Sequence, residues 1–168
     1  MHDAEQPSSN MDILQKIKTM PAMASMNEKE LTELLRISKI SSYEPGELIV
    51  DEGTYEGWIY YLISGRVRIV KNDTELAVLR RIGDIFGAIG SITGGDLAVS
   101  VYAMDDATCL KIDMSHLDSL PNENRYVFRY VIFRGVAEIL AKRLRVTTEK
   151  YLKAKEEIKQ LTSGRTQG

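Results

Sequence analysis

The sequence predicts a mainly β fold, either a sandwich or a barrel, with helices flanking it at both ends. Three observations support this prediction. Short β-prone runs separated by turn-forming residues fill the middle of the chain. An amphipathic helix with a capping signal precedes them, and a long helical run without proline follows them. A chain of 168 residues, of which 43% are hydrophobic, is long enough to bury such a core.

The N-terminal part of the chain changes from a polar segment to a helix. Residues 1–10 contain Pro7 followed by three polar residues and show no apolar period, so we expect them to be disordered. Residues 11–17 form a short amphipathic turn. Asn27 is a candidate N-cap, Glu30 lies at the capping-box position, and leucines follow at helical spacing. This pattern predicts a helix of about three turns.

Six strands are predicted in the domain that we assign to residues 11–120. They are Glu47–Val50, Trp58–Ile63, Arg66–Val70, Leu76–Arg80, Ala98–Ala103 and Thr108–Ile112. Residue pairs that favour tight turns lie between them: Pro45-Gly46, Glu52-Gly53, Ser64-Gly65, Asn72-Asp73, Gly94-Gly95 and Asp105-Asp106. Many short strands with turns at this spacing are typical of sandwiches and barrels.

The C-terminal part is predicted to be one long helix over residues 121–161, followed by a flexible tail at 162–168. Steps of four and three residues alternate along this helix in the a/d pattern of a coiled coil: Phe133, Ala137, Leu140, Leu144, Thr147, Tyr151, Ala154, Ile158 and Leu161. We therefore expect a homodimer whose seam contains Leu140, Leu144, Thr147, Tyr151 and Ile158. The alternative is a seam that packs against the chain's own barrel, which becomes strained beyond Leu144.

Two polar features mark this seam. In a parallel dimer, Lys150 would approach Lys155 of the partner subunit, and like charges there oppose pairing. Thr147 puts a hydroxyl into an otherwise apolar seam, and Thr148 adds a second hydroxyl at the same height. A polar seam residue either specifies the register of the two helices or faces a ligand beside the dimer axis.

Charge is distributed unevenly along the chain. Residues 1–124 hold 11 basic and 20 acidic side chains, whereas residues 125–168 hold 11 basic and 4 acidic side chains. The basic C-terminal segment either contacts nucleic acid or acidic lipid, or forms the solvated face of a helix beside an acidic domain. Its basic residues are spread along the segment rather than packed in a block, which favours the second interpretation.

Few residues suit catalysis or metal binding. The two histidines are His2 and His116, and no Cys/His set has the spacing of metal ligands. We expect His116 to be a surface or capping residue, Asp105-Asp106 to form a turn, and the single cysteine, Cys109, to be buried. No apolar run reaches the ~18 residues of a membrane span, and no signal-peptide pattern is present. A cytoplasmic, non-enzymatic protein with no cofactor and no membrane partner is therefore expected.

The order of the motifs resembles a known family. The elements are a leading helix, Pro45-Gly46-Glu47, the run "YLISGRVRIV", the loop "GDIFGAIGSITGG" and a long terminal helix. Over about residues 12–160 they are similar to the cyclic-nucleotide-binding domain of the catabolite activator protein family, and "ILAKRLRVTTEK" is especially similar to its dimerisation helix. The resemblance implies a β-roll, a double-stranded jelly-roll-like barrel, with N-terminal helices and a long C-terminal dimerisation helix.

The resemblance also implies a ligand site. In the family's phosphate-binding cassette, backbone N–H groups at a helix N-terminus bind the phosphate, a glutamate binds the ribose hydroxyl, and an arginine and a Ser or Thr bind the phosphate. This alignment places Ala88, Leu97 and Ala98 at the three side-chain positions, where they cannot make these contacts. The implied ligand-binding residues are Phe86, Gly87, Ala88, Ile89, Gly90, Leu97 and Ala98, together with Thr147 and Thr148, which match family positions that contact the adenine.

The resemblance implies a dimeric sensory module that signals to an unidentified downstream protein. With this cassette we expect it to bind a less charged ligand, to bind cyclic nucleotide weakly, or to bind no ligand and act as a dimerising scaffold. Another cation could restore the phosphate contact; the candidates are Arg66, Arg68, Arg80, Arg81 and Arg143. The alternative is a transcription regulator. Because only seven residues follow Leu161, too few for a helix-turn-helix, sequence-specific DNA binding would then require a partner chain.

Overall fold

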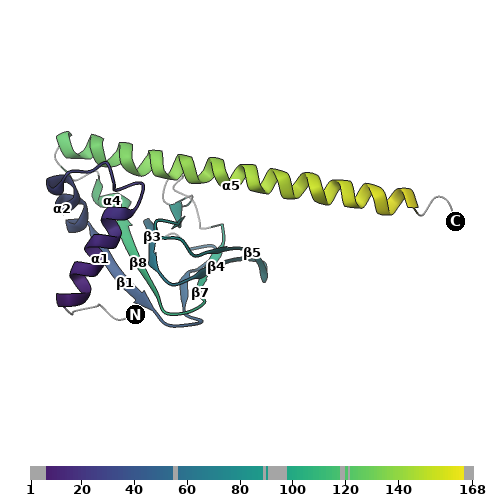
Figure 1. Cartoon of the computed structure of the whole chain (residues 1–168), viewed down its shortest axis with the longest axis horizontal. Coiled ribbons are helices and arrows are strands. Elements are labelled where there is room, and N and C mark those ends of the chain that lie inside the picture. The colour runs from purple at the N-terminus through teal and green to yellow at the C-terminus, as the bar shows by residue number, and fades with distance from the viewer. Residues whose placement is uncertain are drawn as a thin grey trace. The chain divides into compact units, whose positions relative to one another are not determined.

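The computed structural model describes residues 7–54, 57–88, 90, 98–117, 120 and 122–164. The chain divides into two compact units, Met1–Gly135 and Val136–Gly168. The first unit contains two β-sheets and the helices around them, and the second is the C-terminal part of one long helix (Figure 1).

Two helices precede the sheets: α1 over Pro7–Thr19 and α2 over Glu28–Arg36. The capping box predicted for α2 is confirmed. The Asn27 side chain accepts the Glu30 N–H, and the Glu30 carboxylate accepts the Asn27 N–H, each at 2.9 Å. Helix α1 begins earlier than predicted, because residues 7–10 form its first turn instead of belonging to a disordered segment. Proline is favoured at the start of a helix, where its missing N–H costs no hydrogen bond.

The described residues form two four-stranded antiparallel sheets, with the strand orders β1-β8-β3-β6 and β2-β7-β4-β5. The mainly β fold with flanking helices is therefore confirmed. The strand bounds are Ser38–Tyr43 (β1), Leu48–Val50 (β2), Trp58–Ser64 (β3), Val67–Lys71 (β4), Thr74–Leu79 (β5), Ile85–Phe86 (β6), Ser100–Ala103 (β7) and Ala107–Asp113 (β8).

Two of these strands were not among the six predicted. Strand β1 has three serines and a lysine among its six residues, yet it pairs with β8 along its whole length, from Ser38 opposite Ile112 to Tyr43 opposite Ala107. Strand β6 has only two residues, which pair with β3. Both strands are determined by pairing with distant segments rather than by local propensity, and a sequence pattern does not show that pairing. Strand β7 also begins at Ser100, later than the predicted start at Ala98.

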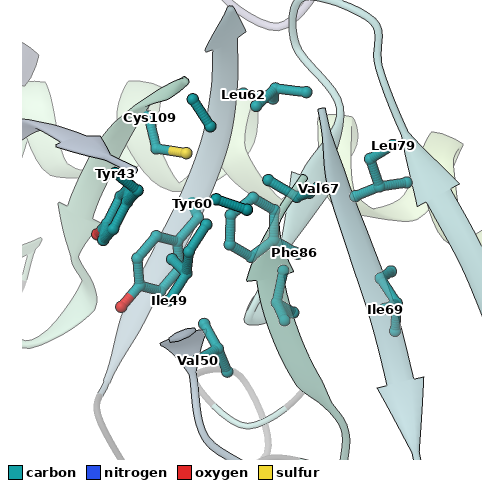
Figure 2. Close-up of a cluster of buried hydrophobic side chains, with 13 residues drawn as sticks. Tyr43, Ile49, Val50, Tyr60, Leu62, Val67, Ile69, Leu79, Phe86 and Cys109 are labelled. Carbon is teal, nitrogen blue, oxygen red and sulfur yellow. The ribbon is translucent and has the colours of Figure 1, made fainter. Parts of the chain in front are cut away.

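The two sheets enclose a hydrophobic core to which both contribute side chains (Figure 2). Tyr60 and Phe86 stack at its centre, with ring centroids 4.9 Å apart and planes 10° from parallel. Cys109 is fully buried in the same core, as predicted, and burial raises the pKa of its thiol to about 12. Tyr60, Phe86 and Cys109 thus define the inner face of the first sheet.

Helices α4 (Met114–Leu117) and α5 (Asn122–Gly164) follow β8. Helix α5 confirms the predicted long helix and continues into the segment predicted as a flexible tail. It is unbroken at Gly135, where a Cβ atom would lie 3.2 Å from Ala22 Cβ, so glycine permits close packing there. Among the described residues, no helix combines the length and the apolar character that crossing a bilayer requires.

Candidate ligand-binding site

Backbone hydrogen bonds to β3 fix the chain where it enters the glycine-rich loop. The Gly83 N–H donates to the Leu62 carbonyl at 2.8 Å, and the Leu62 N–H donates to the Asp84 carbonyl at 2.9 Å. The Asp84 carboxylate accepts the backbone N–H groups of Arg80 and Arg81 at 3.0 and 2.9 Å. Gly83 and Asp84 therefore hold the chain beside β3, so that the next residues pair with β3 as β6.

Gly87 lies directly after β6 and packs against β3. Its φ of +74° lies in the left-handed region that glycine adopts without strain. A Cβ at this position would lie 2.9 Å from both the Trp58 carbonyl oxygen and Tyr60 Cδ2. The close approach of the loop to β3 therefore requires glycine at position 87.

The described part of the cassette is apolar at the positions that matter most for a cyclic nucleotide. Phe86 and Ala88 are buried, with exposed fractions of 2% and 6%, and Gly90 is buried too. Ala98 is exposed just before β7. Ile89 and Leu97 lie outside the described residues. Thus no carboxylate occupies position 88, where the resemblance implies a ribose contact.

Four of the arginines considered as replacements for the missing phosphate contact belong to the first unit. They either contact other side chains or lie on an exposed turn. Arg66 forms a salt bridge with Asp105, with Nε 2.7 Å from Oδ2, and this contact lowers the pKa of the Asp105 carboxyl. Arg68 lies over the Tyr102 ring at 5.3 Å. Arg80 and Arg81 are exposed on the turn before Gly83. The fifth candidate, Arg143, belongs to the second unit.

A lysine that no sequence motif indicates lies at the far end of the cassette. Lys71 Nζ donates to the Ala98 carbonyl at 2.7 Å and to Glu52 Oε1 at 3.0 Å. The Glu52 N–H in turn donates to Ser100 Oγ at 3.1 Å. The Lys71 charge is paired with Glu52. The main effect of Lys71 is therefore to hold the segment just before β7 against β4.

Two further lysines lie on the inner face of the first sheet. Lys39 of β1 is opposite Lys111 of β8, Lys111 is opposite Tyr60 of β3, and Tyr60 is opposite Phe86 of β6. Residues directly opposite one another in antiparallel strands share a face, so these four side chains form one row across the sheet. This row connects distant parts of the chain, and only the strand register reveals it.

Trp58 lies beside this row. Its ring has the Lys111 ammonium 5.0 Å and the Lys39 ammonium 5.6 Å from its centroid, and Lys111 is also 5.2 Å from the Tyr60 centroid. Exposure increases along the row: Tyr60 is buried, Lys111 and Trp58 are half-buried, and Lys39 is exposed. The two cations therefore lie where the core opens to solvent.

The opposite face of this sheet carries an apolar pocket of about 270 Å³. Leu14 of α1, Leu35 of α2 and Leu110 of β8 line it, together with Ser38 and Ile40 of β1. It offers few polar groups, because the Ser38 hydroxyl already donates to the Leu34 carbonyl at 2.6 Å. This pocket lies away from the cassette, since Ile40 and Leu110 alternate with the inward-facing residues of their strands.

The remaining site candidates lie on the second unit. Thr147, Thr148 and the predicted seam residues from Leu140 to Ile158 all belong to α5. Leu144, Tyr151 and Ile158 have exposed fractions of 69%, 62% and 63%. The predicted seam is therefore an accessible apolar stripe on this helix.

The described residues contain no group of three or more His, Cys, Asp or Glu side chains that could hold a metal ion. His116 is exposed in α4, with Nδ1 2.9 Å from Asp113 Oδ2, in agreement with the surface or capping role predicted for it. Asp113 also accepts the N–H and hydroxyl of Ser115, at 2.9 and 2.6 Å. These hydrogen bonds of Asp113 stabilise the start of α4.

Comparison with known proteins identifies the class. A family model for the cyclic nucleotide-binding domain matches residues 40–124, half of the chain. A cyclic nucleotide-binding domain from Methylobacillus flagellatus KT has a similar structure, with a TM-score of 0.71 and 16% identity, over 88% of this chain and 84% of that one. The catabolite activator protein of Thermus thermophilus matches with a TM-score of 0.61 and 22% identity, over 78% of this chain and 61% of that one.

Among curated proteins, a cGMP-dependent protein kinase of Eimeria tenella is 24% identical over 132 residues. The match covers 78% of this chain but only 13% of the kinase, so the chain spans about an eighth of that relative's length. The two sheets, the helices at both ends and the long terminal helix define a jelly-roll-like fold. The chain belongs to the cyclic nucleotide-binding domain family.

Proposed function

We propose that this chain is a non-enzymatic, dimeric regulatory module whose cassette binds cyclic nucleotides weakly or not at all. The observation that carries this proposal is the buried methyl group of Ala88 at the position where the family resemblance implies a glutamate. A ribose hydroxyl requires a hydrogen-bond acceptor that alanine does not have.

Loss of the phosphate contact supports the same conclusion. Leu97 and Ala98 replace the arginine and the Ser or Thr of the family pattern. Truncating one partner of a buried, hydrogen-bonded charge pair costs about 2–5 kcal/mol, and each ~1.4 kcal/mol weakens binding tenfold. Losing the ribose and phosphate contacts together would weaken the binding of cAMP by roughly three to five orders of magnitude.

The described backbone at the start of the loop supports a remaining site for an anion or another small ligand. Gly87 holds the close approach to β3, and the chain is helical at Ala88 and Gly90. Free N–H groups at the start of a helix favour a negatively charged or hydrogen-bond-accepting group. We therefore propose that Phe86, Gly87, Ala88, Ile89, Gly90, Leu97 and Ala98 still line a ligand site, with Thr147 and Thr148 as further candidates.

We propose that dimerisation links ligand binding at this site to a signal that a further protein receives. The stripe Leu140, Leu144, Thr147, Tyr151 and Ile158 repeats at a/d spacing and is exposed along α5. Exposed apolar residues at this spacing are stabilised by burial against a second helix. A second copy of the chain supplies a helix with the same pattern, so we propose a homodimer that signals to a further protein.

Calorimetric titration of the full chain with cAMP and with cGMP tests the cassette. We expect weak or undetectable heats, with any dissociation constant well above the micromolar range. A submicromolar constant for either nucleotide would show that other groups of the protein replace the missing contacts, and the proposal of a weakened cassette would fail.

A further inference from the structure

Lys71 is a basic side chain in direct contact with the cassette. Its ammonium group donates to the Ala98 carbonyl at 2.7 Å, and Ala98 stands where the family resemblance implies a Ser or Thr that binds the phosphate. Val67 and Ile69 of β4 are buried in the core between the sheets, and Lys71, two residues further along the strand, continues their face. The residue that Lys71 contacts directly follows Leu97, the position at which the resemblance implies an arginine.

The carboxylate of Glu52 neutralises the charge of Lys71. Lys71 Nζ lies 3.0 Å from Glu52 Oε1, and the two groups form an ion pair. Their side chains keep exposed fractions of 44% and 33%, so solvent and small molecules reach both of them. An ammonium group has three N–H donors, of which the Ala98 carbonyl and the Glu52 carboxylate accept two. Lys71 therefore meets a ligand as one member of a pair that has no net charge.

The backbone of Glu52 holds this residue in place independently of its carboxylate. Its N–H donates to Ser100 Oγ at 3.1 Å, and Ser100 is the first residue of β7. On its other side, Glu52 follows β2 by two residues. Replacing the carboxylate with an amide therefore changes the charge of the ion pair and leaves the contact with Ser100 intact.

We propose that Glu52 is a specificity-determining residue: by neutralising Lys71, it makes the Ala98 end of the cassette suit an uncharged hydrogen-bonding group of a ligand in place of a phosphate. This inference deepens the proposed function and rests on its premise that Ala98 lines a ligand site. A phosphate at Ala98 lies within the Debye length of about 8 Å of both charges, so their effects on it largely cancel. An uncharged group loses nothing by this cancellation, since it can still form a hydrogen bond with either side chain.

The variant Glu52→Gln tests this proposal on the full chain. It keeps a side-chain oxygen that accepts a hydrogen bond from Lys71, but it removes the negative charge beside the ammonium group. We expect it to bind cAMP about threefold to tenfold more tightly than the original chain does, the range expected for one partly exposed charge. NMR titration of the isotope-labelled protein measures such weak affinities, and the amide spectrum shows that each variant is folded.

Adenosine and inorganic phosphate separate the effect of charge from that of the nucleoside. Adenosine has no phosphate, so its affinity should be the same for the original chain and for Glu52→Gln. A gain for inorganic phosphate as large as that for cAMP would assign the effect to the free anion, and a gain for cAMP alone would assign it to the phosphodiester. An equal gain for adenosine would overturn the proposal, because the effect would then not depend on charge.

Two further variants show whether the gain depends on Lys71. Glu28→Gln is the matched control, since it removes the carboxylate of another exposed ion pair, with Lys18, and changes the net charge equally. Its cAMP affinity should equal that of the original chain. Adding Lys71→Gln to Glu52→Gln should abolish the gain, because the glutamine amide still donates to the Ala98 carbonyl but carries no charge.

A cAMP affinity of Glu52→Gln no higher than that of Glu28→Gln would overturn this inference and leave the proposed weak binding of cyclic nucleotides intact. A gain that persists without the Lys71 charge would also overturn it. Submicromolar binding of cAMP by the original chain would overturn the proposed function, and with it this inference, because a neutralised Lys71 would then not limit the binding of a phosphate.

Discussion

Gly87 lies so close to Tyr60 that a Cβ atom on it would be 2.9 Å from Cδ2 of the ring. The same Cβ would be 2.9 Å from the Trp58 carbonyl oxygen. The Trp58 carbonyl belongs to the backbone of β3, which cannot move aside as the end of a flexible side chain can. The turn that leads from β6 into the cassette therefore depends on the absence of a side chain at residue 87.

Replacing Gly87 with alanine should destabilise the protein by more than the strain of its backbone alone. A non-glycine residue at a left-handed φ costs about 1–2 kcal/mol, and overpacking adds typically about 1–3 kcal/mol. Gly46→Ala is a matched control, because Gly46 has a φ of +86° but nothing within 4 Å of its Cβ position. Urea unfolding should show a larger loss of unfolding free energy for Gly87→Ala. Equal losses for the two variants would contradict the close packing on Tyr60.

Cys109 should not react with thiol reagents in the folded protein. It is fully buried between the sheets, and burial raises the pKa of its thiol to about 12, so the reactive thiolate is scarce at neutral pH. Mass spectrometry after treatment with iodoacetamide should show unmodified native protein and complete modification in urea. Because the chain has one cysteine, the mass shift has a single source. Rapid modification under native conditions would show that this core opens.

The structure also predicts how stability depends on pH. Burial raises the pKa of Asp113, but hydrogen bonds from Ser115 and His116 outweigh this effect and hold the pKa below its ordinary value. The ionised carboxylate therefore stabilises the folded state above the unfolded pKa of about 3.9, and the contribution is lost as pH falls through the folded pKa.

Asp113→Asn should accordingly lower the free energy of unfolding at pH 7 by about 1–2 kcal/mol. The difference from the original chain should shrink once the pH falls below ~4. Ser115→Ala is the companion variant, since it removes one donor and keeps the carboxylate, and its loss should be smaller. Denaturant unfolding at several pH values measures both, and a difference that stays constant into acid would refute the assignment.

Local signals in the sequence were sufficient for the helices and for most strands. Asn27 and Glu30 specify a capping box through residues three apart, and the structure shows both of its hydrogen bonds. Strand β1 has no such signal, because its serines and lysine become a strand only through pairing with β8. Propensity describes a segment alone, whereas pairing depends on residues far along the chain.

The candidate site, too, could be predicted from the sequence only in part. The family resemblance predicts that Phe86 to Gly90 belong to a ligand-binding cassette, and the structure adds the close approach of Gly87 to Tyr60. The row Lys39, Lys111 and Tyr60 was not predicted, because its members lie on three strands and only the register brings them together. The five arginines considered as replacement cations could not be ranked without knowing contacts such as Arg66 to Asp105.

The predicted seam on α5 can be tested against an equally apolar neighbour. Leu144→Lys combined with Tyr151→Lys puts charges at two a positions and should convert dimers into monomers in sedimentation experiments. Leu152→Lys is the control, because Leu152 is 58% exposed but lies one position off the seam. That variant should remain dimeric. Monomers of the original chain, or dimers that persist in the double variant, would refute pairing through this stripe.

Restoring the family's charged residues tests the proposal that this cassette lacks the contacts that bind a cyclic nucleotide. Ala88→Glu with Leu97→Arg adds a ribose acceptor and a phosphate countercharge, and should tighten cAMP binding by about two orders of magnitude or more. Ala88→Met with Leu97→Met is the matched control, since it adds similar side-chain volume without a charge or an acceptor for the ribose hydroxyl. Calorimetry should show a gain only for the charged pair. A folded double variant with no gain would mean that the backbone around Ala88 does not present a nucleotide to these two positions, and the proposal that the missing side chains alone weaken binding would fail.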